Sequence, residues 1–237
     1  MKYYQLYNGL LLLLLLFLNP LISLAQPYLI QSKEGYSNVR NDSNAKSKVL
    51  DQLKNNTIVL VDQVEDQDLE KEQWIKILYY ENLPFSIVEI SDEKSLKTGF
   101  IHKSQLTAVN KLEKPSKDEF SMQYVSRDFS LNDKKIVYQD ESASSIKSIN
   151  GIFYYLGDCG IPKEEIYKAE AKINGKKQVI PSKLYLGIIS ATNNFEYYKV
   201  GKVYLAVQEI GDGACANHVV WVFEKDKLSQ RFVGWEF

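Results

Sequence analysis

The stretch HVVWVFEKDKLSQRFVGWEF, residues 218–237, indicates the class of fold. Two runs of β-branched and aromatic residues flank a short charged segment, which predicts two long strands joined by a tight turn. The stretch YYKVGKVYLAVQEI, residues 197–210, has the same pattern and predicts a second pair of strands. Because each strand has an apolar face to bury, we expect an antiparallel sandwich or a barrel-like sheet.

A β-hairpin is predicted upstream of these strands, in EIYKAEAKINGKKQVIP at residues 165–181. Its Asn174-Gly175 dipeptide lies between two alternating runs and supports the positive φ angles of a type I′ turn. The first half contains further runs of strand type, and no stretch of helical period is long enough to compete with them. These runs are KVLDQL (48–53), TIVLVDQV (57–64), QWIKILYY (73–80), FSIVEI (85–90) and TGFIH (98–102). We therefore expect a mainly β protein.

Residues 110–118 separate the two β-rich halves. This segment is charged, contains Pro115 and lacks apolar periodicity, which is typical of a short exposed linker. We predict one β domain at residues 28–109 and a second at residues 119–237. Both lengths fit the usual size of a domain.

The first 25 residues have the pattern of a secretory signal peptide. Lys2 is the only charged residue before an apolar run at residues 10–18, which is shorter than the roughly 20 residues of a membrane-spanning helix. Small residues end the segment, as at a signal-peptidase site, so we predict cleavage between Ala25 and Gln26. An uncleaved anchor helix is the alternative. The mature protein is expected in the periplasm or outside the cell.

The charge balance excludes some classes of partner. The full chain has a formal net charge of −1, and loss of Lys2 with the signal peptide makes it more negative, so no clustered basic surface for nucleic acid is expected. No second apolar run approaches membrane length, so we predict no membrane span after cleavage. His102 and His218 lie in different halves, and Asp158 and Asp212 are isolated. We therefore expect no metal site and no cofactor.

Part of the first half resembles the bacterial SH3 domain family. The family pattern begins with Asn-Val-Arg, matched by residues 38–40, and continues with a VLxxL strand, matched by residues 49–53. For the Trp-x-Lys-Val strand this chain has Trp-Ile-Lys-Ile at residues 74–77, and the closing Gly-Trp-Val-His-x-Ser-x-Leu corresponds to residues 99–106. The resemblance covers residues 34–108 and depends on several ordered elements.

The chain departs from the family pattern at three places. Asn55-Asn56 occupies the turn where a glycine is usual, and asparagine tolerates a left-handed backbone. Phe100 replaces the closing tryptophan, which keeps an aromatic ring and loses the indole donor. Residues 79–97 form a longer segment than the family's usual hairpin, and we expect it to extend two strands or to form a flap.

The resemblance implies a small non-catalytic β-barrel, of a kind often attached to envelope proteins to bind cell-wall peptides or protein partners. A barrel of this size fills its interior with side chains, which leaves binding to surface loops and exposed aromatic residues. Our candidate binding residues are Tyr36, Asn38, Trp74 and Phe100. For the aromatic rings, the alternative is a purely structural role in the core. His102 falls where the family has a histidine in a structural turn, and no catalytic partner accompanies it locally.

The two cysteines, Cys159 and Cys215, allow two interpretations. GDCGIP at residues 157–162 faintly resembles the cysteine motif of papain-like wall peptidases, with His218 downstream. In that family the cysteine begins a helix whose dipole lowers the thiol pKa, whereas Pro162 and a strand pattern follow here. We favour a disulfide between Cys159 and Cys215, formed in an oxidising compartment.

These observations predict an SH3-like barrel followed by an antiparallel sandwich or barrel-like domain with one disulfide, and His218 at the surface where its strand begins. The expected protein is an exported, non-catalytic binding protein of the bacterial envelope that recognises cell-wall peptide or a protein partner. One alternative is a cell-wall cysteine peptidase or amidase that uses Cys159 or Cys215 with His218. A periplasmic inhibitor or immunity protein is another.

Overall fold

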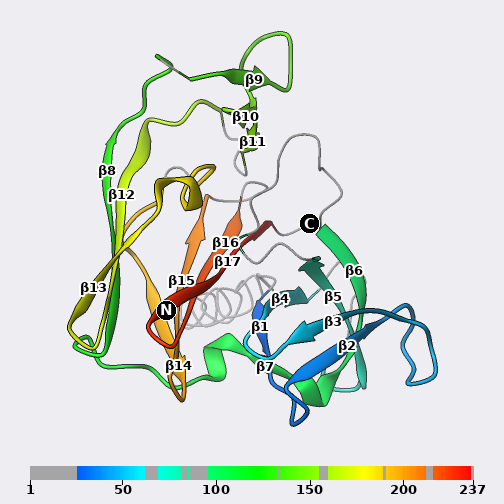
Figure 1. Cartoon of the computed structure of the whole chain (residues 1–237). Coiled ribbons are helices and arrows are strands. Elements are labelled where there is room, and N and C mark those ends of the chain that lie inside the picture. The colour runs from blue at the N-terminus through cyan, green and yellow to red at the C-terminus, as the bar shows by residue number, and fades with distance from the viewer. Residues whose placement is uncertain are drawn as a thin grey trace, which may run out of the picture.

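The computed structural model describes residues 26–61, 69–81, 85, 96–132, 134–154, 160–188, 191–211 and 216–235. The regular structure of these residues is antiparallel β, with short 3₁₀ turns at η2 (Lys103–Gln105), η3 (Val109–Lys111) and η5 (Ser182–Leu184). The prediction of a mainly β protein is confirmed. The predicted signal peptide lies outside the described residues. The described strands form four sheets, three of which stack as layers (Figure 1).

The N-terminal sheet contains the strands of the first half. In spatial order they are β3 (Val49–Lys54), β2 (Tyr36–Arg40), β6 (Leu96–His102), β5 (Trp74–Tyr80), β4 (Ile58–Val61), β1 (Pro27–Ile30) and β7 (Leu106–Ala108). Because β3 and β7 are its two edges, this is an open sheet and not a closed barrel within the described residues. It curves around an inner core to which six strands contribute, with Ile30, Val39, Leu53, Val59, Ile75 and Ile101 as representatives.

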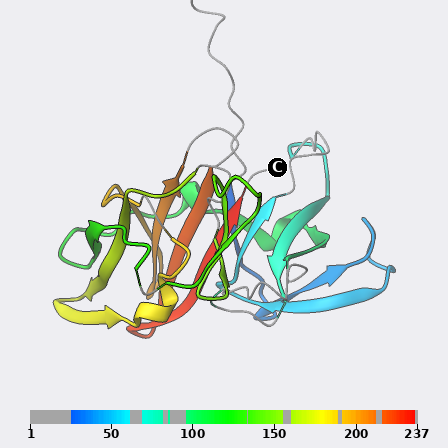
Figure 2. The same ribbon diagram turned by 90° about the horizontal axis from the view of Figure 1, so that it is seen from above.

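The central sheet consists of the four strands predicted from residues 197–210 and 218–237. They are β14 (Glu196–Val200), β15 (Val203–Ile210), β16 (Asn217–Glu224) and β17 (Lys227–Trp235), each antiparallel to the next. Figures 1 and 2 both show this sheet, in orange and red, between the blue-to-cyan N-terminal sheet and a green-to-yellow sheet on its other side. It is therefore the middle layer of the stack.

The third layer is the outer sheet. It contains β8 (Phe120–Asp128), β12 (Glu164–Ile173) and β13 (Lys176–Ile180), with β12 in the middle. A small sheet of β9 (Ile136–Tyr138), β10 (Ile146–Ile149) and β11 (Ile152–Phe153) lies at the top of Figure 1. The inner face of the outer sheet packs against the central sheet, through Phe120, Met122, Ala169 and Ala171.

β16 is buried on both of its faces. Val220 and Val222 join a cluster that also contains Leu60 of β4, so this face meets the N-terminal sheet. Val219 and Trp221 point the opposite way, into the cluster shared with the outer sheet. From the sequence we expect one apolar face per strand, and β16 differs because it lies in the middle layer. An uninterrupted apolar run is the pattern that such a doubly buried strand requires.

Two tight turns use the same left-handed backbone with different residues. Asn174 (φ 47°) and Gly175 (φ 82°) form the two-residue connection between β12 and β13, which confirms the predicted hairpin. Lys225 (φ 50°) and Asp226 (φ 60°) form the equivalent connection between β16 and β17. A positive φ is unfavourable for lysine, so the pairing of the two long strands imposes this turn.

The two halves of the chain share a core, and hydrogen bonds between buried groups also join them. The backbone N–H of Ile58 on β4 donates to Oε1 of Gln230 on β17 at 2.8 Å. The hydroxyl of Tyr80 on β5 donates to the carbonyl of Val233 on β17 at 2.6 Å. The N-terminal sheet is therefore fixed against the central sheet by directional contacts as well as by apolar packing.

The predicted linker, residues 110–118, is mostly exposed. Its Leu112 nevertheless packs against the cluster between the two halves. The carbonyl of Glu113 accepts a hydrogen bond from the backbone N–H of Lys199 on β14 at 2.7 Å. The proposed domain boundaries stay a prediction, and the segment between them is tied to the central sheet.

Candidate functional site

The four predicted binding residues lie on the outward face of the N-terminal sheet. Tyr36 and Asn38 are on β2, Phe100 is on β6 and Trp74 is on β5, which are three neighbouring strands. Along each strand they alternate with residues of the inner core, so their side chains point away from that core. Tyr36 is exposed and the other three are half-buried.

A row of three directly opposed residues crosses these strands. Arg40 of β2 is paired with Phe100 of β6, and Phe100 is paired with Lys76 of β5. Directly paired residues point to the same face of a sheet, so Phe100 lies between two cationic side chains. Arg40 also donates from Nη1 to the carbonyl of Ser47 at 2.7 Å, which ties its side chain to the loop after β2.

Trp74 and His102 lie beside this row. They are directly paired on β5 and β6, with ring centroids 5.3 Å apart and an interplanar angle of 84°. The guanidinium of Arg40 lies 5.9 Å from the centroid of the Trp74 ring, within cation–π range. His102 Nδ1 accepts from the backbone N–H of Ser104 at 3.3 Å and caps η2, in a turn as the resemblance implies. We call Arg40, Trp74, Lys76, Phe100 and His102 the aromatic–cation patch.

Tyr36 and Asn38 lie farther along β2, on the hairpin that β2 forms with β3. Asn38 Oδ1 accepts from Nε2 of Gln52 at 2.9 Å, across the hairpin. The pairing of β2 with β6 is at Arg40. The structure thus brings Trp74 and Phe100 together, and places Tyr36 and Asn38 on the same face beside them.

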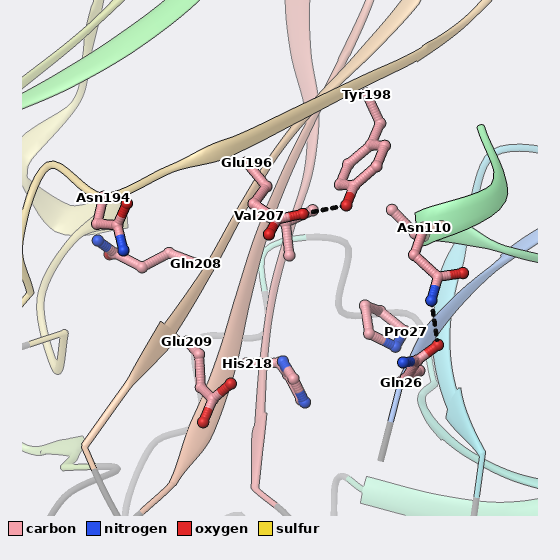
Figure 3. Close-up of a pocket in the computed structure, with 11 residues that line it drawn as sticks. Gln26, Pro27, Asn110, Asn194, Glu196, Tyr198, Val207, Gln208, Glu209 and His218 are labelled. Atoms are coloured by element: carbon pink, nitrogen blue, oxygen red, sulfur yellow. Dashed lines mark hydrogen bonds between the residues drawn. The ribbon is translucent and has the colours of Figure 1, made fainter. Parts of the chain in front are cut away.

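A pocket of about 300 Å³ lies where the central sheet meets the first half (Figure 3). This volume is at the lower end of the range for small-ligand sites. The first half contributes Gln26, Pro27, Val109 and Asn110 to its lining. The central sheet and the loop before it contribute Asn194, Glu196, Tyr198, Val207, Gln208, Glu209 and His218.

Two hydrogen bonds fix polar groups of this pocket (Figure 3). The hydroxyl of Tyr198 donates to the carboxylate of Glu196. Burial of Tyr198, together with that carboxylate, raises the pKa of its hydroxyl to about 12, so Tyr198 remains a donor at neutral pH. On the opposite wall, Asn110 Nδ2 donates to Oε1 of Gln26 at 2.6 Å.

His218 is buried, which corrects the prediction that it lies at the surface. Only 6% of the residue is exposed. It points to the same face of β16 as Val220, and the first half of the chain covers that face. In Figure 3 it lies beside Glu209, its direct partner on β15. The prediction was wrong because the covering residues come from the other end of the sequence.

Glu196 and Glu209 are pocket residues that the sequence analysis did not identify. Each is a single carboxylate in an alternating strand, and no local motif marks it. The pairing of β14 with β15 places Glu196 opposite Val207, two residues from Glu209 along β15. The approach of β1 and η3 then closes the opposite wall of the pocket. Local sequence contains neither of these facts.

Several predictions fall on residues that are not described. Cys159 and Cys215 lie outside the described residues, so the disulfide and the cysteine peptidase alternative stay predictions. Of residues 79–97, the structure describes 79–81, 85, 96 and 97. Tyr80 pairs with Leu96 there, which extends β5 and β6 into this segment. Among the described residues, no group of three or more His, Cys, Asp or Glu side chains is placed to hold a metal ion.

Comparison with known proteins identifies no relative. No protein-family model matches the chain, no curated protein matches it, and no solved structure matches it. The resemblance of residues 34–108 to the bacterial SH3 family stays a prediction that depends on the residues quoted above. In the part of the chain that the structure describes, no helix has the length and apolar character to cross a membrane.

Proposed function

We propose that this protein is an exported, non-catalytic binding protein of the bacterial envelope, and that the aromatic–cation patch contacts its target. The observation that carries the proposal is the row of Arg40, Phe100 and Lys76, with Trp74 beside it. Aromatic and arginine side chains are enriched in binding surfaces. Export and the envelope are inferred from residues 1–25 and from the resemblance of the first half.

The patch suits a peptide that carries a carboxylate next to an apolar group. The guanidinium of Arg40 has the planar geometry to bind a carboxylate with two hydrogen bonds. Lys76 adds a second positive charge on the other side of Phe100. The Phe100 and Trp74 rings offer apolar contact area. Because cell-wall peptides end in free carboxylates, we propose cell-wall peptide as the target, with an acidic segment of an envelope protein as the alternative.

Co-sedimentation with purified sacculi tests this proposal. We expect the wild-type protein in the pellet, and a pelleted fraction at least five-fold lower for Trp74→Ala and for Phe100→Ala. Tyr167→Ala is the matched control, because Tyr167 is 58% exposed on β12 of the outer sheet. Its pelleted fraction should equal that of the wild type. Higher salt should release the wild-type protein, because exposed charges are screened.

Two results would contradict parts of the proposal. A wild-type protein that stays in the supernatant excludes cell-wall peptide as the target and leaves the protein partner. In that case the same variants are compared in cross-linking to envelope proteins. A loss for Tyr167→Ala equal to that of Trp74→Ala removes the patch as the binding surface.

A further inference from the structure

We propose that Asn174, at the tip of the β12–β13 hairpin, is a site of spontaneous deamidation, and that hydrogen bonds protect Asn150 from the same reaction. Each asparagine is followed by a glycine, and these are the two Asn-Gly dipeptides in the part of the chain that the structure describes. Glycine has no side chain to hinder attack by its backbone nitrogen on the preceding residue. The site is separate from the aromatic–cation patch, because no residue of that patch lies in the outer sheet.

The reaction needs only the chain and water. The backbone nitrogen of Gly175 loses its proton to solvent base and attacks Cγ of Asn174, so that a new C–N bond closes a succinimide ring. The bond from Cγ to Nδ2 then breaks, and the amide nitrogen leaves as ammonia. Water adds to one of the two ring carbonyls and opens the ring, which gives aspartate or isoaspartate. No electrons are transferred, and a neutral amide becomes a carboxylate.

The two dipeptides share their local sequence and their backbone. Both follow an isoleucine. Asn150 (φ 54°) and Gly151 (φ 82°) connect β10 to β11, and Asn174 (φ 47°) and Gly175 (φ 82°) connect β12 to β13. Both asparagines are exposed, and the backbone N–H of each donates to a distant carbonyl at 2.8 Å. Only the surroundings of the two side chains distinguish these turns.

The carboxamide of Asn150 is held in place, whereas that of Asn174 is not. Asn150 Oδ1 accepts from the backbone N–H of Lys135 at 2.8 Å. Within the described residues, the side chain of Asn174 has no hydrogen-bond partner. Ring closure requires the carboxamide to turn toward the glycine nitrogen, which breaks the bond to Lys135 at one site and no bond at the other. Local rearrangement is easier where fewer contacts must break, so Asn174 should react faster.

Three lysines near the Asn174 turn favour a negatively charged product. Lys172 and Lys177 are directly paired across the hairpin, and Lys176 follows the turn. All three are exposed. Like charges directly opposite each other destabilise a pair of strands, and a carboxylate at the turn reduces this repulsion.

Two carboxylates already lie close to this hairpin. Glu170 is on the same outward face as Lys172, and it forms an ion pair with Lys168 at 2.9 Å. Glu119 accepts from the backbone N–H of Asn174 through its carbonyl, and its carboxylate pairs with Lys199 at 3.0 Å. Each therefore has another lysine as its partner, and the new carboxylate meets the three lysines of the hairpin. Aspartate also accepts the left-handed backbone of the turn, whereas isoaspartate adds a backbone atom to it.

Peptide mapping by mass spectrometry tests the inference on the whole folded protein. The protein is incubated in mildly alkaline buffer, and each site is followed through the mass difference between an amide and a carboxyl group. We expect Asn174 to be lost at least three-fold faster than Asn150, because one net hydrogen bond is worth roughly that factor or more. The same protein unfolded in guanidinium is the matched control. There the rates at the two sites should agree within two-fold, since their local sequences match.

A variant tests the electrostatic part of the argument. Asn174→Asp reproduces the aspartate product, so at low salt its thermal unfolding temperature should equal or exceed that of the wild type. Any gain should disappear at high salt, because exposed charges are screened. A lower unfolding temperature at low salt would overturn the favourable effect of the three lysines.

Two results of the mapping would overturn the proposed site itself. One is equal or faster loss of Asn150 in the folded protein. The other is an intact Asn174 in the folded protein after the unfolded control has reacted completely. Binding to sacculi is a separate measurement, so failure of the proposed function and failure of the deamidation site are distinguishable.

Discussion

β16 of the central sheet and β3 of the N-terminal sheet are both strands, but their surroundings are opposite. In β16 every residue from Asn217 to Phe223 is buried, whereas in β3 only Leu53 is. β16 is an inner strand of the middle layer, and β3 is an edge strand of an outer layer. A strand in the middle layer is covered on both faces, so its side chains stabilise the protein. An edge strand of an outside layer keeps exposed side chains, which can contact other molecules.

Two of the three tryptophans, Trp221 and Trp74, show this difference in burial with the same type of side chain. Trp221 on β16 is fully buried, and its Nε1 donates to the hydroxyl of Tyr124 on β8 at 2.7 Å. Trp74 on β5 is half-buried and contacts Arg40 and His102 on the outward face. The Trp221 side chain therefore joins the central sheet to the outer sheet, whereas the Trp74 side chain lies at the surface of the N-terminal sheet.

The largest expected difference in the free energy of unfolding is between the alanine variants of these two tryptophans. Trp221→Ala should lower the free energy of unfolding by about 3–5 kcal/mol, because it leaves a cavity and removes the donor to Tyr124. Trp74→Ala should cost about 1 kcal/mol or less, since little buried area is lost. Urea unfolding followed by circular dichroism measures both. Equal losses of unfolding free energy for the two variants would contradict the different roles of the two tryptophans.

A smaller loss of stability is expected from a substitution at Gly234, where β17 meets the N-terminal sheet. A Cβ added at Gly234 lies 2.7 Å from Cε1 of Phe232 and 2.9 Å from Cδ1 of Leu60. Gly234→Ala should therefore destabilise the protein by about 1–3 kcal/mol through overpacking. Adding Leu60→Ala removes one of the two clashing atoms, so the double variant should cost less than the sum of the single ones. Strict additivity would show that these two layers are not in close contact.

The hydrogen bond from Tyr80 to Val233 allows the contact between the N-terminal and central sheets to be tested through a single interaction. Tyr80→Phe should lower the free energy of unfolding by about 0.5–1.5 kcal/mol, because the hydrogen bond from the Tyr80 hydroxyl to the Val233 carbonyl is lost. Unfolding of the variant should remain a single transition, since the shared apolar core still couples the halves. Guanidinium unfolding followed by fluorescence and by far-ultraviolet circular dichroism checks this. Non-coincident curves in the wild type would contradict a shared core.

The smallest effect at neutral pH concerns the buried tyrosines. Burial raises the pKa of Tyr79, Tyr154 and Tyr198 to about 12, with nearby carboxylates adding to the rise for Tyr79 and Tyr198. An unfolded tyrosine titrates near 10, so the folded state is favoured while these hydroxyls are protonated. Their contribution is complete below pH 10 and is lost as the pH rises to about 12. Thermal unfolding from pH 8 to 12 should show this decline, and Tyr198→Phe should reduce it. An unchanged slope in Tyr198→Phe would contradict its raised pKa.

Local sequence predicts most of the individual strands because their patterns are local. The runs at residues 48–53, 73–80 and 98–102 correspond to β3, β5 and β6, and the Asn174-Gly175 turn is where its backbone preference places it. The turn at Lys225 and Asp226 has no such marker. Long-range pairing of β16 and β17 determines it.

Local sequence likewise predicts some residues of the candidate sites, and long-range pairing determines the others. Trp74 and Phe100 are identified from the sequence, because they belong to an ordered set of elements along one segment. Arg40 joins them only because β2 pairs with β6 at that residue. Glu196, Glu209 and Gln208 have no shared motif, and the pocket that they line also needs Pro27 and Val109 from the first half.

The sequence by itself determined that this chain is built from antiparallel strands, since alternation and turn preference act over a few residues. Only the tertiary structure decided which faces of those strands are covered. β16 is buried on both sides and His218 is enclosed because the first half of the chain packs onto the second. Such packing minimises the apolar area exposed by the whole molecule, and no short stretch of sequence contains that information.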